Sequence, residues 1–119
     1  MMNSSFRLVT KIILHKRSRT LEVQFQSGEN FVLPCEYLRV FSPSAEVQGH
    51  GAESPKLVLD KQGINILMIE PVGHYGIKPI FSDGHQSGIY TWDTLYELGV
   101  NHQKNWQDYL EKSSLARKN

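Results

Sequence analysis

The residues best suited to chemistry in this chain lie close together, in the stretch 81–92. Carboxylate, imidazole and hydroxyl side chains alternate there with two glycines, and aromatic residues follow. The change of pattern predicts a junction between a sheet and a helix, where binding sites are common. The candidate binding residues of this stretch are Asp83, His85, Ser87, Tyr90 and Trp92. The alternative is a capping network, in which these polar groups bond only to the loop itself.

Five histidines raise the question of a metal site. Mononuclear iron oxygenases hold iron with two histidines and one carboxylate, and their local His-x-Asp or His-x-Glu signature is absent. We expect His74, Asp83 and His85 at the ends of neighbouring strands, where they could form a metal site with His50 as a further ligand. Such a site would hold iron or zinc weakly, and the domain would require no cofactor. The alternative is a set of turn histidines that bond to the backbone.

Cysteine content and glycine spacing exclude several chemistries. Cys35 is the single cysteine, so no disulfide forms within the chain and a cysteine zinc site is excluded. No flanking signature marks Cys35 as a nucleophile, and we expect a buried, inert thiol. None of the glycines forms a phosphate-binding loop, and no Gly-x-Ser-x-Gly elbow is present. We therefore predict that the chain is not an enzyme.

Size and charge narrow the class of protein further. The 119 residues suit a single domain, and 39% hydrophobic with 21% charged residues favours a folded chain. The net charge of +1 provides no long-range field for nucleic acid or an anionic membrane. We interpret the basic stretch 11–19 as a solvated hairpin rather than a phosphate-binding patch, because no aromatic platform accompanies it. Without a signal peptide, a membrane span or paired cysteines, a cytoplasmic location is expected.

Alternating and apolar patterns predict the strands. The first is expected at 8–14, with the even-numbered residues Leu8 to Leu14 on one face, and the alternation at 21–25 predicts its hairpin partner. Short strands follow at 31–33 and 57–59. The stretch 64–72 is apolar on both faces, which predicts a central strand, and another is expected at 77–81.

Helical segments complete the predicted fold. Pro34 opens a short helix over 35–41, since proline suits a first helical turn. Thr91 is expected to cap a C-terminal helix that ends or bends at Gly99, with a second helical segment before a frayed end at 112–119. The fold class is α+β, a mostly antiparallel sheet of about five to seven strands with the helices packed on it. Residues 1–119 form one domain, ordered over about 8–112, with flexible termini and a flexible loop at 45–56.

A family resemblance rests on the stretch 81–92 together with Leu38-Arg39 and the segment 42–47. On these residues the chain resembles the γ-butyrobetaine hydroxylase-like N-terminal domain family (DUF971), over about residues 12–110. The resemblance adds Arg39 to the candidate binding residues. In the hydroxylases, a separate domain carries the catalytic chemistry. The small domain holds a structural zinc through three cysteines and a histidine, and it helps chains to pair as dimers.

The resemblance implies that this zinc is lost. The cysteine positions fall on Ser42, Ser44 and Val47, and the histidine falls on His85. Hydroxyls and a valine cannot replace thiolates around zinc.

The function that the resemblance implies is a non-enzymatic accessory or interaction domain with an unidentified protein partner, and a homodimer is a further option. The alternative is a metal-binding domain or an accessory factor in iron–sulfur protein assembly, since related proteins join this domain to an iron–sulfur carrier. A 2-oxoglutarate-dependent oxidoreductase is the least favoured interpretation, because the iron-binding signature is absent.

Overall fold

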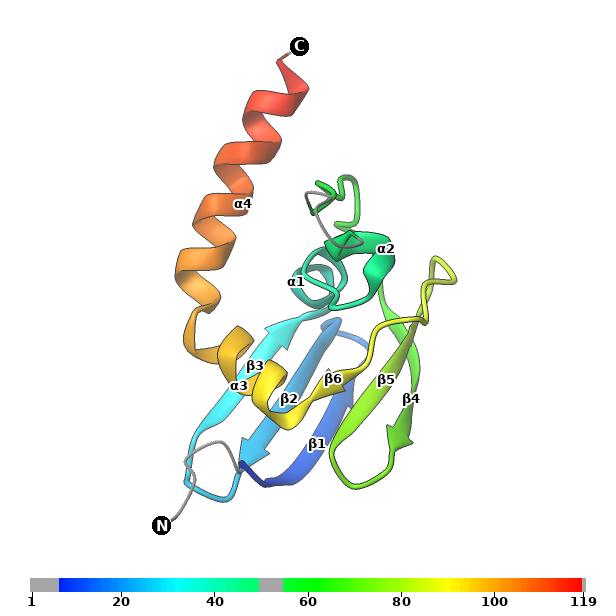
Figure 1. Cartoon of the computed structure of the whole chain (residues 1–119), viewed down its shortest axis with the longest axis vertical. Helices are drawn as coiled ribbons and strands as arrows, with labels where there is room; N and C mark the ends of the chain where they lie inside the picture. The colour runs from blue at the N-terminus through cyan, green and yellow to red at the C-terminus, as the bar shows by residue number, and fades with distance from the viewer. Residues whose placement is uncertain (1–6, 50–54, 119) are drawn as a thin grey trace.

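The α+β class is confirmed by the structure, a computed structural model that describes residues 7–49 and 55–118. The strands of the described residues form two antiparallel sheets, ordered β1-β2-β3 and β4-β5-β6, rather than the single sheet expected. The strands are β1 Val9–His15, β2 Thr20–Phe25, β3 Asn30–Pro34, β4 Ile66–Val72, β5 Gly76–Phe81 and β6 Tyr90–Thr91. The helices are α1 Cys35–Val40, α2 Ala45–Gln48, α3 Trp92–Val100 and α4 His102–Arg117. In Figure 1, α1 and α2 lie at one end of the sheets, and α4 extends away from them.

Alternation explains the first sheet. In β2, Leu21, Val23 and Phe25 are buried and the residues between them are partly exposed, as a half-buried strand requires. β2 pairs with β1 on one side and with β3 on the other. Leu33 of β3 lies opposite Leu21 and enters the same core. The hairpin predicted from 8–14 and 21–25 is therefore confirmed.

The predicted face of β1 is wrong at its beginning. The register shifts between Val9 and Lys11, so Thr10 is an extra residue, a β-bulge. Leu8 and Thr10 are exposed, whereas Val9 packs against the core. After the bulge, even-numbered residues such as Ile12 face the core as predicted. A strict period of two cannot anticipate this, because one extra residue reverses the alternation.

The strand predicted as central lies at an edge. Among the described strands β4 pairs only with β5, and Leu67 and Met68 are each 53% exposed. The register shifts between Ile66 and Met68, a second irregularity that leaves Leu67 outside the regular ladder. β5 holds the central position, and its inward side chains are buried. Apolar residues on both faces of a strand therefore do not by themselves show that both faces are covered.

The connection between the sheets also differs from the prediction. Within the expected loop 45–56, α2 forms and buries Val47, while residues 50–54, with His50, lie outside the described residues. No strand forms at 57–59. The carbonyl of Val58 instead accepts a hydrogen bond of 2.7 Å from the hydroxyl of Tyr109, so a helix side chain satisfies this backbone group.

α3 begins where the sequence predicts. The Thr91 hydroxyl accepts a 3.1 Å hydrogen bond from the backbone N–H of Thr94, which is the expected N-cap. Gly99 lies inside the helix, one residue before its last, and has a packing role. A Cβ at this position would lie 2.4 Å from the ring of Phe31, so only glycine lets β3 approach α3 this closely.

α4 packs on α1 through aromatic rings. The rings of Tyr37 and His102 lie 4.3 Å apart between centroids, and Trp106 meets the Tyr37 ring edge-on at 6.2 Å. The helix continues to Arg117, beyond the point where fraying was predicted. In the part of the chain that the structure describes, no helix combines the length and apolarity that a membrane crossing requires.

Candidate functional site

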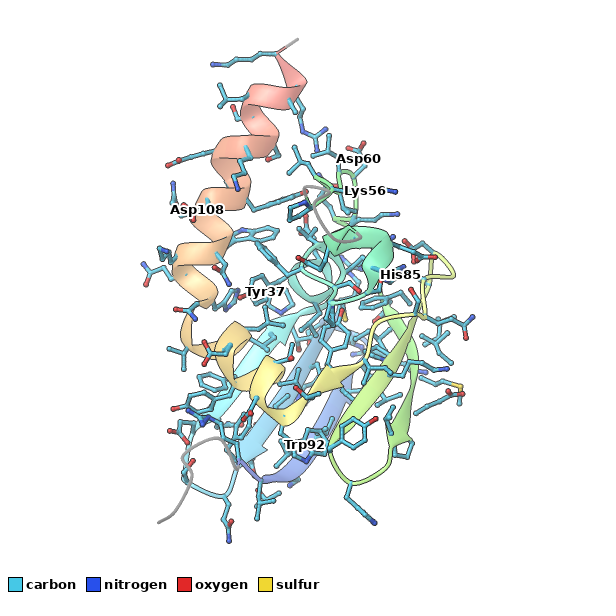
Figure 2. The ribbon with its side chains drawn as sticks, viewed as in Figure 1. Tyr37, Lys56, Asp60, His85, Trp92 and Asp108 are labelled. Atoms are coloured by element: carbon cyan, nitrogen blue, oxygen red, sulfur yellow. The ribbon has the colours of Figure 1, made fainter. Side chains whose placement is uncertain are left out.

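A loop and two short helices meet at one corner of the molecule. Loop 82–88 follows β5 and folds back on it, with the backbone N–H of Phe81 donating to the carbonyl of His85 at 3.0 Å. Gly84 has a φ of 93°, a conformation that favours glycine. The loop packs on the segment 39–48, which comprises the end of α1, α2 and the link between them. We call residues 39–48 and 82–90 the α1–α2 corner. Figure 2 shows His85 at this end of the molecule and Trp92 toward the other.

His85 lies at the centre of the α1–α2 corner, and its side chain is only 5% exposed. Its Nε2 lies 2.9 Å from Oγ of Ser42, and its Nδ1 lies 3.1 Å from Oε1 of Glu46. Ser87 donates a 2.9 Å hydrogen bond to the same carboxylate oxygen. Burial, and then the Arg39 guanidinium, lower the pKa of His85 by more than the two nearby carboxylates raise it. The neutral ring therefore donates from Nδ1 to Glu46 and accepts at Nε2 from Ser42.

Asp83 joins three segments of the chain. Its Oδ2 accepts hydrogen bonds from Nε of Arg39 at 2.9 Å and from Nζ of Lys61 at 2.7 Å. Its Oδ1 accepts from the backbone N–H of His85 at 3.0 Å. Burial alone would raise the pKa of Asp83, but the bonds from Lys61, the amide and Arg39 outweigh it and lower the pKa to about 2. The charged carboxylate thus fastens α1, the turn before β4 and loop 82–88 together.

Gly88 and Tyr90 form the inner side of the corner. Tyr90 is fully buried, its hydroxyl donates to the carbonyl of Leu38, and burial raises its pKa. A Cβ on Gly88 would lie 2.5 Å from Oγ of Ser42. Only glycine therefore allows this approach, and Tyr90 positions the loop without reaching the surface.

The structure does not bring all the predicted residues together. Asp83, His85, Ser87 and Arg39 meet at the α1–α2 corner. Trp92 instead donates from Nε1 to the carbonyl of His74, in the turn between β4 and β5. His74 precedes β5 and His85 follows it, so the two histidines lie beyond opposite ends of a six-residue strand that spans about 17 Å.

The metal site of His74, Asp83 and His85 is therefore not formed. Among the described residues no group of three His, Cys, Asp or Glu side chains could hold a metal ion. The two histidines do follow neighbouring strands, β4 and β5, as predicted. These strands are antiparallel, so the two strand ends lie at opposite ends of the sheet and the histidines do not meet.

Ser42, His85 and Glu46 have the connectivity of a nucleophile, a base and an orienting carboxylate. Ser42 is nevertheless 0% exposed and covered by Gly88. Its Oγ also accepts a hydrogen bond from the backbone N–H of Ser44 at 3.3 Å. This hydroxyl is therefore closed to solvent in the structure. Sequence reasoning missed Glu46 as a partner of His85 and Ser87, because residues about 40 positions apart leave no local pattern.

The fold and the corner together define a small α+β domain with two sheets, in which the polar side chains of the corner bond mainly to one another. The chain belongs to the γ-butyrobetaine hydroxylase-like N-terminal domain family, whose model matches residues 12–96. The resemblance found in the sequence is therefore confirmed.

Solved structures support this assignment. Two NMR solution structures each show 45% sequence identity to this chain, with TM-scores of 0.83 and 0.80. The alignments cover 98% and 92% of this chain, and 87% and 86% of theirs. A crystal structure of a DUF971 family protein of unknown function from Acidithiobacillus ferrooxidans is 34% identical, with a TM-score of 0.65. That alignment covers 76% of this chain and 91% of the other. No match was found among the curated proteins.

The positions that resemble the family's zinc ligands come together in this chain. Ser42 contacts His85, the Ser44 amide contacts Ser42, and Val47 is buried one turn further on. The buried Oγ of Ser44 has no hydrogen-bond partner among the described residues. One imidazole, two hydroxyls and an apolar side chain do not suit zinc, which prefers thiolate and imidazole ligands. These positions therefore lie in one part of the corner but supply no set of zinc ligands.

Proposed function

We propose that this chain is a non-enzymatic interaction domain, and that the outer face of the connection between β5 and β6 contacts a protein partner. This connection comprises loop 82–88 and Ile89 and is called loop 82–89. The internal bonding of the α1–α2 corner carries the proposal. His85 bonds to Ser42 and Glu46, the Ser87 hydroxyl bonds to the same carboxylate, and Asp83 is held by two cations. A reacting group must instead be open to its substrate.

The residues left for a partner are those on the outside of the loop. Gln86 is exposed, and Ile89, an apolar residue, is 42% exposed. The bonds of Asp83 and His85 fix the loop from behind, so it can bind without losing much conformational entropy. Asp83, His85 and Tyr90 thus act as positioning residues in this proposal, and Gln86 and Ile89 make the contacts.

Cross-linking in cells tests the loop surface. Ile89→Asp should remove cross-linked partners, while Val100→Asp should keep them, since Val100 is an even more exposed apolar residue, at 56%, but lies on α3. Thermal melting of both variants checks that each remains folded. Partners that persist in folded Ile89→Asp protein would show that loop 82–89 is not the contact surface.

Metal binding and a role in iron–sulfur protein assembly form a second proposal. It is supported by the family resemblance alone, because Ser42, Ser44 and Val47 supply no metal ligand beside His85. Metal analysis of protein purified without an affinity tag tests it. Less than about a tenth of an equivalent of iron or zinc, with no shift in melting temperature on adding either metal, would remove it. Turnover of 2-oxoglutarate by the purified chain would overturn the non-enzymatic assignment.

A homodimer stays a proposal as well. β4 offers an edge strand, but its bulge at Leu67 and Pro71 interrupt the row of backbone groups that a second strand would need. Sedimentation at two protein concentrations would show whether chains pair.

A further inference from the structure

Hydrogen bonds through Asn65 connect the basic turn 16–19 of the first hairpin to loop 82–88. The turn 16–19 connects β1 to β2, and its Lys16 carbonyl accepts a 3.0 Å bond from the side chain of Asn65. The backbone carbonyl of Asn65 accepts a 2.8 Å bond from the N–H of Ser82, and the backbone N–H of Asn65 donates to the Ser82 hydroxyl at 2.9 Å. Ser82 precedes Asp83, which holds Lys61. Three segments far apart in sequence therefore meet at one end of the two sheets, beside α1 (Figure 1).

The cations of this region exceed its carboxylates. Lys16, Arg17 and Arg19 are exposed, and no carboxylate of the described residues lies within ion-pair distance of them. Lys61 is linked to the turn only indirectly, through Asp83, Ser82 and Asn65. It shares Asp83 with Arg39, so that carboxylate is already occupied. The whole chain has a net charge of only +1, so this cationic surface is a local excess that the rest of the chain offsets. We call Lys16, Arg17, Arg19 and Lys61 the basic surface.

The turn is also held in a fixed conformation. The carbonyl of Arg19 accepts a 2.9 Å hydrogen bond from the backbone N–H of Cys35, at the start of α1. Arg19 itself has a φ of 56°, which is uncommon for a residue other than glycine and needs support from its surroundings. Bonds to Asn65 on one side and Cys35 on the other provide that support. The cations therefore stand on a fixed base, which favours recognition of a partner over general solvation.

The chemistry of the surface favours a protein segment over other polyanions. Single-stranded nucleic acid needs aromatic platforms for its bases, and the turn 16–19 contains none. An anionic membrane needs an amphipathic helix or an apolar anchor beside the cations, and the turn offers neither. Exposed lysine and arginine side chains on a fixed turn suit a short run of carboxylates.

We propose that the basic surface binds an acidic segment of a partner protein, rich in Asp and Glu. This inference rests on the proposed function, because it names the chemistry of the partner that loop 82–89 would contact. The basic surface adjoins that loop through Asn65 and Asp83, so one partner can contact both. The carboxylates of the segment would supply the counter-charges that the basic surface lacks.

A labelled deca-glutamate peptide is the probe, and fluorescence polarisation with the full chain at low ionic strength is the measurement. The variant Lys16→Glu/Arg17→Glu should weaken binding by about tenfold or more, because it reverses two charges at the surface. The matched control Lys104→Glu/Lys112→Glu makes the same change of charge on α4 and should stay within about twofold of wild type. Salt at about 0.3 M should weaken wild-type binding, as for exposed charges.

Four outcomes would overturn the inference. They are no binding of the peptide at low ionic strength, an equal loss in the α4 control, tighter binding of a deca-thymidine oligonucleotide, and tighter binding of phosphatidylserine vesicles. The cross-linking experiment separates this inference from the proposed function. Partners that are lost with Ile89→Asp but retained with the charge reversal would disprove the acidic segment and leave the interaction domain standing.

Discussion

His85 is held in one ring orientation by two different neighbours. Ser42 donates to its Nε2, and its Nδ1–H donates to Glu46, so the neutral ring satisfies both. A protonated ring would present a second donor to Ser42, whose hydroxyl already accepts the Ser44 amide. Both the burial of His85 and this hydrogen-bond arrangement therefore oppose protonation of its ring.

Acid should weaken the fold through His85. Its pKa is lowered in the folded chain, chiefly by burial, so below about pH 6.5 the unfolded chain takes up a proton that the folded chain resists. Stability is then complete above that pH and falls as the pH decreases. We expect His85→Gln to reduce the loss of melting temperature between pH 7.5 and pH 5.5 (about the range in which histidine titrates). His74→Gln, in the exposed β4–β5 turn, is the control, and an unchanged slope in His85→Gln would contradict the assignment.

Gly88 should be intolerant of any side chain. In Gly88→Ala the new Cβ would overlap Oγ of Ser42, so the loop must move and the free energy of unfolding should fall by about 1–3 kcal/mol. Gly63→Ala is the matched control, because nothing lies within 4 Å of its added Cβ and its φ is not positive. It should be neutral or slightly stabilising. Chemical denaturation of both variants measures the difference, and equal stability would show that the loop relaxes freely.

At the scale of the element, the sequence predicted correctly those helices and strands that depend on residues close together in the chain. The alternation in β2, proline before α1 and the Thr91 cap each act within a few residues, and each is confirmed. The bulge at Thr10 and the edge position of β4 depend on partner strands, which the sequence does not show. The corner was foreseen in part: His85 and its loop were named, but Glu46 reaches them only through the tertiary fold.

The α1–α2 corner should accept a metal if thiol ligands are introduced beside His85. In Ser42→Cys/Ser44→Cys/Val47→Cys, three thiols would join His85, and Ser42 already contacts the imidazole at 2.9 Å. Three thiolates and one imidazole suit tetrahedral zinc. We expect about one equivalent of bound zinc and a higher melting temperature in its presence. The same variant with His85→Gln should bind zinc more weakly, and a triple variant that retains no zinc would show that the corner lacks the required geometry.

The whole molecule consists of the family domain and a helix outside the matched residues. The family model ends at residue 96, within α3, whereas α4 spans His102–Arg117. α4 rests on α1 through Trp106, which meets the ring of the buried core residue Tyr37 edge-on, and α4 contributes no residue to the buried core cluster of the described residues. The two sheets and α1 therefore contain most of the buried apolar residues without α4.

Removal of one ring should thus loosen α4 while the sheets stay folded. Trp106→Ala deletes the ring that stacks on Tyr109 and meets Tyr37 edge-on, and a half-buried tryptophan should cost about 2 kcal/mol, less than a fully buried one. Hydrogen exchange should speed up in α4 and stay slow in β2 and β5, because local opening follows the contacts that are lost. Lys104→Ala, on an exposed position of the same helix, should leave exchange unchanged. Equal acceleration in the sheets would mean that α4 and the family domain unfold as one unit.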